Sequence, residues 1–144
     1  MLRKANREDL DHVAGLAKML WPKNELSALK EEFKGYLDDK HACILLAFDK
    51  ENAIGFAQCQ LRFDYVEGTK TSPVGYLEGI FVRESYRNNG YARELVKDCE
   101  RWAEEQGCSE FASDCTIDNE ESLAMHLRLG FIEVGRIICF KKSL

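Results

Sequence analysis

The segment from Gly75 to Cys115 places the strongest constraint on the fold of this chain. "GYLEGIFV" (75–82) is an apolar run of strand length, and residues 90–106 carry apolar side chains at helical spacing. Gly107 ends the helical pattern, and "EFASDC" (110–115) has the length and composition of a short strand. A strand, a helix and a second strand in this order form a crossover, whose two strands run parallel in one sheet. We therefore expect parallel pairing between residues 75–82 and 110–115.

The rest of the pattern adds antiparallel strands and further helices. "ACILLAF" (42–48) and "AIGFAQCQLRF" (53–63) are strand-like and are joined by the short turn "DKEN", so they should pair antiparallel. Three helices are expected: one over residues 6–20, capped by Asn6, one from Leu26 to Leu37, and one over 119–129, capped by Asp118. A final strand or strand pair is expected over residues 131–140. The order β-α-α-β-β-β-α-β-α-β predicts an α/β fold, in which a mixed sheet carries helices on both faces. We expect residues 1–144 to form a single domain.

The apolar pattern of residues 53–63 changes phase. Ile54 and Phe56 share one phase, and Ala57 and Cys59 continue in the other. An extra residue in one strand produces such a change, so the pattern predicts a β-bulge at Phe56–Ala57.

Composition excludes several classes of protein. Hydrophobic residues make up 45% of the 144 residues, which argues against a disordered chain. No apolar run reaches the length of a membrane span, and "MLRKANREDLDHV" contains no apolar signal region, so we expect a cytoplasmic protein without a membrane partner. The net charge of −5, without a basic cluster, argues against nucleic acid as a partner. An acidic surface fits a cationic substrate, but it fits a role in solubility equally well.

The six cysteines lie at positions 43, 59, 99, 108, 115 and 139, and no pair has C-x-x-C spacing. Most of them fall in apolar runs such as "ACILLAF" and "IICF". We expect buried free thiols, with neither a metal site nor disulfides.

The loop "YRNNGYA" (86–92) follows a predicted strand and opens a long helix. It matches neither the P-loop nor the dinucleotide-binding pattern of glycines. Unpaired N–H groups at the start of a helix form an anion site, for which phosphate is the usual ligand. Gly90 and Ala92 permit close approach of the ligand to the backbone, and Arg87 can add a charged contact. A turn in which glycine serves geometry alone fits this spacing equally well.

Two motifs identify a family. "FVRESYRNNGYARELV" resembles the acetyl-CoA motif of the GNAT superfamily of N-acetyltransferases, [RQ]-x-x-G-x-[GA], with Arg87, Gly90 and Ala92 in the fixed places. About thirty residues further on, "NEESLAMHLRLGF" resembles the second half of the family signature, with Asn119, Ser122 and a closing Leu-Gly-Phe. The resemblance implies the GNAT-like acyl-CoA N-acyltransferase fold, in which two parallel strands splay apart.

The resemblance also implies how acetyl-CoA binds. The pyrophosphate would rest on the loop backbone, and the pantetheine arm would lie between the splayed strands 75–82 and 110–115. A backbone N–H of residues 80–82 would polarise the acetyl carbonyl. The implied cofactor-binding residues are Ile80, Phe81, Val82, Arg87, Asn88, Asn89, Gly90, Tyr91, Ala92, Asn119 and Ser122.

Further stretches resemble one branch of the family, the aminoglycoside 6'-N-acetyltransferases. They are "LWP" (20–22), "RFDYVEG" (62–68), "SPVGYLEGIFV" (72–82), "ASD" (112–114) and "GF" (130–131). This likeness implies a cationic aminosugar as acetyl acceptor, a role in antibiotic resistance and a homodimer.

A polyamine acceptor requires carboxylates near its ammonium groups. Glu78 interrupts an apolar strand, and alternation places it with Tyr76, Ile80 and Val82; Asp114 lies near the end of the neighbouring strand. Because the nucleophile must be the neutral amine, a carboxylate is the natural base, directly or through water. Glu78 at an exposed bulge and Asp114 at the start of a loop remain open as purely structural alternatives.

Two aromatic residues and one histidine complete the predicted site. Trp21 and Tyr65 are candidates for walls of the sugar site, although either fits a place in the core. His126 occupies the place where many family members carry a tyrosine that protonates the departing thiolate, and a partly buried helix position explains it as well. We predict direct attack in a ternary complex, with no cysteine as nucleophile.

Two other functions fit the same motifs. One is a GNAT acetyltransferase for a different amine, such as a polyamine or a protein N-terminus. The other is a regulator that binds acyl-CoA without catalysis, against which Glu78 and Asp114 argue.

Overall fold

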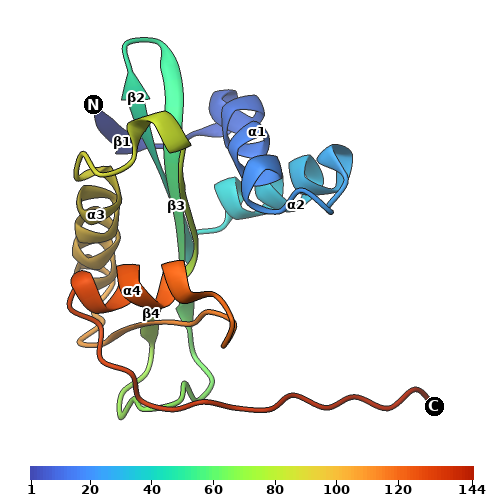
Figure 1. The fold of residues 1–144 in the computed structure, drawn as a ribbon, viewed down its shortest axis with the longest axis vertical. Coiled ribbons are helices and arrows are strands. Elements are labelled where there is room, and N and C mark those ends of the chain that lie inside the picture. Colours follow the sequence, from blue (N-terminus) through green and yellow to red (C-terminus); the bar gives the residue numbers. More distant parts are fainter.

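A computed structural model describes residues 1–144 of the chain. The strands are β1 (Leu2–Lys4), β2 (Ala42–Asp49), β3 (Asn52–Arg62), β4 (Val74–Val82) and β5 (Phe111–Ser113). The α-helices are α1 (Leu10–Leu20), α2 (Leu26–Asp38), α3 (Tyr91–Glu105) and α4 (Glu120–Arg128), and the short 3-10 helices are η1 (Arg7–Asp9) and η2 (Glu84–Tyr86). Figure 1 shows how these elements surround the sheet. No helix has the length and apolarity needed to cross a membrane.

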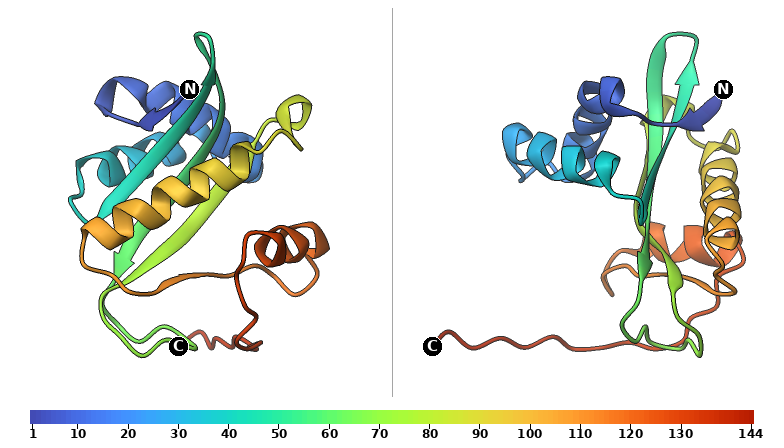
Figure 2. Two further views of the ribbon diagram at one scale, coloured as in Figure 1. Left: turned by 90° about the vertical axis from the view of Figure 1, so that its left-hand side faces the viewer. Right: turned by 180° about the vertical axis from the view of Figure 1, so that it is seen from behind.

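The strands form one mixed sheet in the order β1-β2-β3-β4-β5. Neighbours from β1 to β4 pair antiparallel, and β4 pairs parallel with β5. The crossover through α3 therefore has the predicted parallel strands, and the α/β fold with a mixed sheet is confirmed. In the right-hand view of Figure 2 the sheet stands edge-on, with α1 and α2 on one face and α3 on the other.

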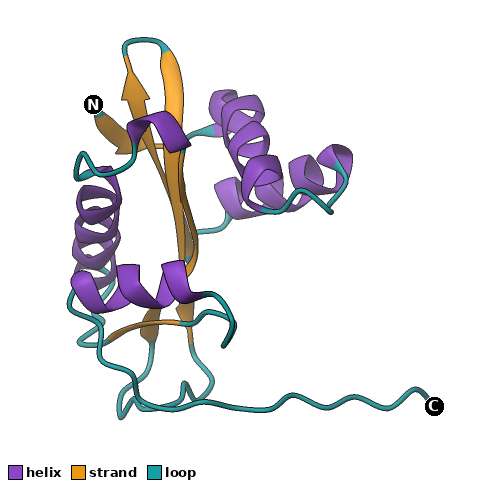
Figure 3. Ribbon diagram, in the orientation of Figure 1, coloured by secondary structure: helices purple, strands orange, loops and turns teal.

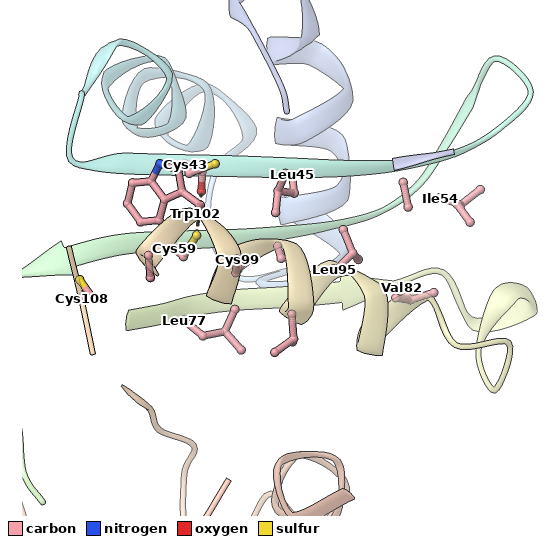
Figure 4. Close-up of a cluster of buried hydrophobic side chains, with 14 residues drawn as sticks. Cys43, Leu45, Ile54, Cys59, Leu77, Val82, Leu95, Cys99, Trp102 and Cys108 are labelled. Carbon is pink, nitrogen blue, oxygen red and sulfur yellow. Dashed lines mark hydrogen bonds between the residues drawn. The ribbon is translucent and has the colours of Figure 1, made fainter. Parts of the chain in front are cut away.

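Each face of the sheet has its own hydrophobic core. Val13, Leu16 and Phe33 of α1 and α2 pack against side chains such as Leu46 and Phe56 on one face. On the other face, α3 packs against β2, β3 and β4, and its buried residues include Leu95, Val96, Cys99 and Trp102 (Figure 4). Because both faces of β2 and β3 are covered, these strands have near-continuous apolar sequences.

The cysteines divide into two groups. Cys43, Cys59, Cys99 and Cys108 are buried free thiols, as predicted, and Cys59 Sγ lies 3.6 Å from the carbonyl oxygen of Cys43 (Figure 4). Cys115 and Cys139 are exposed, so the prediction of a buried thiol in "IICF" is wrong. No group of three or more His, Cys, Asp and Glu side chains is placed to hold a metal ion.

The bulge in β3 is displaced from its predicted position. Ala47 pairs with Gly55 and Phe48 pairs with Ala53, so Ile54 is the extra residue. Ile54 packs on the α3 face, whereas Phe56 packs on the α1–α2 face. The change of phase therefore occurs at Ile54, two residues before the predicted Phe56–Ala57. Small residues around it, Ala53 and Gly55, obscured the position because they suit either face.

Residues 131–144 contain no regular structure, so the predicted final strand over 131–140 is wrong for this chain (Figure 3). A strand needs a neighbour to satisfy its backbone N–H and C=O groups, and this segment leads away from the sheet. Its apolar side chains are exposed: Ile132, Val134, Ile137, Ile138 and Phe140. Val134, although exposed, lies against Gly68 in the loop between β3 and β4, where an added Cβ would come within 2.6 Å of it.

The start of the first helical segment is capped as predicted. The Asn6 side chain accepts from the N–H of Glu8, and the Asp9 carboxylate accepts from the N–H of Asn6 at 2.9 Å. The Arg3 guanidinium donates two further bonds to Asp9, at 2.7 and 2.8 Å. The nearly buried carboxylate of Asp9 thus joins β1 to the first helical turn.

Replacing Asp9 with asparagine is expected to lower the free energy of unfolding by about 1–3 kcal/mol at pH 7. The bonds from Arg3 and Asn6 hold the pKa of Asp9 below its ordinary value of 3.8. Its contribution is therefore complete above pH 3.8 and is lost as the pH falls through the lower pKa of the folded state. Urea unfolding of both proteins at pH 7 and at pH 3 measures this. A difference that stays the same at both values would contradict the assignment.

Candidate active site

The sheet opens where β4 and β5 part. Their pairing covers only Gly75 to Leu77 on β4 and ends at Ser113. From Glu78 onward, one edge of β4 has no strand beside it, while the other edge stays paired with β3. The family resemblance implies an opening between these two parallel strands, and the structure has one, because β5 ends at Ser113 while β4 continues to Val82.

The backbone phase of β4 determines which groups face the open edge. The N–H of Arg83 donates to the carbonyl of Ile54 in β3 at 2.8 Å. Alternate residues of an antiparallel strand direct their backbone groups to opposite edges. Phe81 therefore faces β3, and the N–H groups of Ile80 and Val82 face the open edge.

A β-bulge places Glu78 at the point where the strands part. Gln58 pairs with Gly79 and Cys59 pairs with Leu77, so Glu78 is the extra residue. Leu77 and Val82 consequently pack on the same α3 face although one is odd-numbered and the other even. The prediction that Glu78 shares a face with Ile80 and Val82 is wrong, because it assumed unbroken alternation.

Glu78 instead lies on the side of Tyr76, with a cationic partner. Arg62, the last residue of β3, donates from Nε at 2.9 Å and from one terminal nitrogen at 2.6 Å to the same carboxylate oxygen of Glu78. That terminal nitrogen also lies 2.8 Å from the second oxygen. The Glu78 side chain is 16% exposed and that of Arg62 is 43% exposed. Arg62 was not predicted, because its partner is far from it in the sequence.

Asp114 follows β5 and accepts a short hydrogen bond from the hydroxyl of Tyr76. Burial, together with the Asp114 carboxylate, raises the pKa of Tyr76. The guanidinium carbon of Arg62 lies 3.4 Å from the centroid of the same tyrosine ring. Tyr76 and Arg62 therefore connect the two carboxylates that the sequence analysis singled out.

The two aromatic candidates have different positions. The Trp21 ring packs against Phe33 and Phe56, and it lies so close to Gly79 that a Cβ there would come within 2.7 Å of it. Trp21 thus belongs both to the core and to the surroundings of Glu78. Tyr65 is 76% exposed, and its hydroxyl accepts from the N–H of Gly68 in its own loop. No hydrogen bond or ring contact joins Tyr65 to Glu78 or Asp114.

The loop before α3 has the open backbone that the sequence predicts. Asn88 and Gly90 adopt positive φ values of 65° and 86°. No side chain caps the start of α3 at Tyr91, and a Cβ at Gly90 would meet nothing within 4 Å. The N–H groups of the first helical turn, which includes Ala92, therefore have no side-chain cap, as an anion site at a helix start requires.

Arg87 is already engaged by the strands and by α4. Its Nε donates to the carbonyl of Val82 at 2.8 Å, and a terminal nitrogen lies 3.5 Å from a carboxylate oxygen of Glu121. Asn89 donates to the carbonyls of Tyr86 and Arg87 within the loop. These contacts join the end of β4, the loop and the start of α4.

An open pocket of about 750 Å³ adjoins this region. Six residues line it: Met19, Phe81, Arg83, Glu84, Ser85 and Arg87. Its charged wall residues are two arginines and one glutamate. Arg83 was not predicted as a site residue, although its place four residues before Arg87 could have suggested it.

The second predicted motif forms α4. Asn119, not Asp118, caps this helix, because its side chain accepts from the N–H of Ser122 at 3.0 Å. His126 Nδ1 lies 2.7 Å from the carbonyl oxygen of Ser122, and Nε2 lies 2.7 Å from the hydroxyl of Ser113. Since a carbonyl oxygen only accepts, Nδ1 carries the proton in the neutral ring and Nε2 accepts from Ser113. His126 thus reaches the opening of the sheet through Ser113, a residue the sequence analysis did not select.

Comparison with known proteins identifies the family. Residues 10–131 match the Acetyltransferase (GNAT) family. The chain is 45% identical to aminoglycoside N(6')-acetyltransferase type 1 of Acinetobacter genomosp. 13. The 131 aligned residues cover 90% of this chain and 89% of that protein. It is 41% identical over 141 residues to the enzyme of the same name from Salmonella typhimurium, covering 98% and 97% of the two chains.

Solved structures agree with this match. The structure is similar to that of the aminoglycoside N-acetyltransferase AAC(6')-Iy in complex with CoA, with a TM-score of 0.96, 39% identity and coverage of 100% and 95% of the two chains. AAC(6')-Iy is also known in complex with the bisubstrate analogue CoA-S-monomethyl-acetylneamine, where the TM-score is 0.96. The chain therefore belongs to the GNAT acetyltransferase family and, within it, to the aminoglycoside N(6')-acetyltransferases.

Proposed function

We propose that this chain transfers an acetyl group from acetyl-CoA to the 6'-amine of aminoglycosides, by direct attack in a ternary complex. One observation carries the proposal. The open edge of β4, where a thioester can lie, begins at Glu78, which the network of Arg62 and Tyr76 connects to Asp114. The strand edge proposed to bind acetyl-CoA and the acidic groups proposed to bind the acceptor thus meet at Glu78.

The residues around the opening fit acetyl-CoA. Unpaired N–H groups of Ile80 and Val82 can bond the pantetheine amides as a neighbouring strand would. The backbone from Arg87 to Ala92, with nothing adjoining Gly90, suits the pyrophosphate. Further contacts are assigned to Phe81, Asn88, Asn89, Tyr91, Asn119 and Ser122. Arg83 and Arg87 add positive charge on the wall of the adjoining pocket.

Acetyl-CoA supplies the acetyl group as a thioester, whose thiolate is a good leaving group. The chain orients the carbonyl with the N–H groups of the open edge, which also stabilise negative charge on its oxygen. Glu78 takes the proton of the attacking amine, directly or through water.

The acceptor lies on the side of Glu78 and Asp114. Both carboxylates can bind ammonium groups, and Asp114 keeps one carboxylate oxygen free of the tyrosine hydroxyl. Trp21 offers an apolar surface beside Glu78, and Tyr65 can cover the sugar from the loop between β3 and β4. Acetylation removes a positive charge from the drug, which weakens its attraction to anionic RNA and accounts for resistance.

A proton for the departing thiolate can come from His126. The hydroxyl of Ser113 lies between the His126 ring and the opening of the sheet, and it also lies 3.3 Å from the carbonyl oxygen of Leu77. Protonation of His126 would reverse its bond with Ser113, so the hydroxyl can pass a proton outward.

We infer that residues 1–144 act as one catalytic domain in a cytoplasmic homodimer. The buried free thiols and the use of acetyl-CoA support a cytoplasmic location. The row of exposed apolar side chains between Ile132 and Phe140 supports a dimer, because a second copy would remove that surface from water. Sedimentation equilibrium gives the mass of the particle and thereby tests the dimer.

Thiol release from acetyl-CoA tests the function directly. The assay should compare an aminoglycoside carrying a 6'-amine with its 6'-hydroxyl analogue, and both with a polyamine and a peptide N-terminus. We expect turnover with the 6'-amine alone. Turnover with the polyamine or peptide instead would favour a different acceptor. Stabilisation by acetyl-CoA without turnover of any amine would favour a non-catalytic regulator.

A further inference from the structure

Arg62 is unusual among the groups around Glu78 because it is a cation in a site for cationic substrates. Its guanidinium makes three contacts of 2.6–2.9 Å with the carboxylate of Glu78. The pair lies at the mouth of the site, where the Arg62 side chain is 43% exposed. The Glu78 side chain is only 16% exposed, so the pair is partly buried, and removing either partner leaves the other charge without compensation. A contribution to stability does not by itself explain why a cation lies in this site.

The arrangement does explain how Glu78 keeps its position. Glu78 is the extra residue of a bulge, so neither β3 nor β5 fixes it by regular pairing. The guanidinium of Arg62 binds both carboxylate oxygens of Glu78. It also lies over the ring of Tyr76, with its central carbon 3.4 Å from the ring centroid. Tyr76 is in turn fixed by Asp114. The orientation of Glu78 therefore depends on a chain of contacts through Arg62 and Tyr76.

The contacts leave Glu78 able to bind an amine. A carboxylate offers about four lone-pair sites, and Arg62 uses three contacts, two of them on the same oxygen. One position on the second oxygen stays available. Two tyrosines near Glu78, Tyr36 of α2 and Tyr76, have raised pKa values, chiefly because they are buried, and the Glu78 carboxylate adds to both shifts. Asp114 lies beyond Tyr76. Arg62 is the one cation in direct contact with Glu78.

A fixed positive charge beside Glu78 also acts on the bound amine. It repels an ammonium more than a neutral amine, and the neutral amine is the nucleophile. We infer that Arg62 is a positioning residue for the transfer: it orients Glu78 toward the acceptor and favours the neutral form of the acceptor amine. This inference rests on the proposed function, because it requires a cationic acceptor at Glu78.

The test is a kinetic comparison of Arg62→Gln, Arg62→Lys and the wild type, with an aminoglycoside and acetyl-CoA as substrates. Arg62→Gln should lower kcat about 10- to 100-fold, the equivalent of losing a charged hydrogen bond. The KM for the aminoglycoside should stay the same or fall, because the site becomes more acidic, and the KM for acetyl-CoA should not change. Arg62→Lys keeps the positive charge but lacks the planar guanidinium with its several donors. It should therefore have a kcat between those of Arg62→Gln and the wild type.

A double-mutant cycle separates this role from a structural one. In a Glu78→Gln background, Arg62→Gln should cause no further loss or should raise activity, because it removes an unpaired guanidinium. Additive losses, an unchanged kcat in Arg62→Gln, or a parallel rise in both KM values would overturn the inference. Wild-type turnover in the same assay tests the proposed function separately, since a wild type inactive on aminoglycosides would refute that function.

Discussion

Replacing Glu78 with glutamine is expected to lower kcat/KM for an aminoglycoside by about 10²- to 10⁴-fold, the range for loss of a general base. Two effects act in the same direction. The amide cannot take a proton from the attacking amine, and Arg62 loses its carboxylate and becomes an unpaired cation in the acceptor site. The KM for acetyl-CoA should change little, because the N–H groups proposed to bind the cofactor belong to Ile80 and Val82 and not to Glu78.

Glu78→Asp is the matched control for that substitution. It keeps the negative charge but shortens the side chain by one methylene, so we expect activity between those of the wild type and Glu78→Gln. Steady-state kinetics with both substrates varied measure the effect, and thermal unfolding checks that the variants are folded. If Glu78→Gln retained wild-type turnover, the assignment of the base would be wrong.

Replacing Ile80 with proline is expected to lower kcat about 10²- to 10³-fold, the usual cost of losing one oxyanion donor. Its N–H faces the open edge of β4, so proline removes a donor to the cofactor without removing a bond to β3. Proline is tolerated where the N–H of a strand residue lacks a partner in the sheet. The preceding residue, Gly79, also adapts to the restriction that proline imposes.

Phe81→Pro is the control for Ile80→Pro. Phe81 lies opposite Phe56 with its backbone directed toward β3, so proline there removes a bond inside the sheet. We expect a large fall in the thermal midpoint for Phe81→Pro and a shift of only a few degrees for Ile80→Pro. Full turnover in a folded Ile80→Pro variant would show that its N–H does not serve the acetyl group.

The sequence was most informative where local pattern and tertiary structure agree. The crossover from β4 through α3 to β5 was predictable because an apolar strand, a glycine loop and an amphipathic helix have distinct periodicities. The loop at Gly90 was predictable for a similar reason, since a backbone at positive φ favours glycine. The cap at Asn6 also follows from local chemistry.

The errors arose where a non-local pairing decides the outcome. The bulge at Glu78 reverses the faces of the residues that follow it, and alternation within β4 alone cannot reveal it. Arg62 and Glu78 meet only because β3 and β4 are neighbours. The segment 131–140 has the apolar character of a strand, but in this structure no strand pairs with it.

The side-chain contacts within the site could not be predicted either, because they join different strands and helices. The sequence places Glu78 and Asp114 near one end of the sheet, and the family resemblance adds His126. It could not indicate that Tyr76 binds Asp114 or that Ser113 binds His126, because these bonds depend on how far β5 runs beside β4. The chemical roles of these residues therefore stay predictions, and the structure supplies the contacts between them.

The position of the acetyl group in the product tests the central claim most directly. The purified chain should be incubated with acetyl-CoA and an aminoglycoside that carries several amines, and the product should be analysed by mass spectrometry and NMR. The account predicts a single acetyl group, located on the 6'-nitrogen. Acetylation at another nitrogen, or acetyl-CoA consumption without an acetylated aminoglycoside, would contradict it.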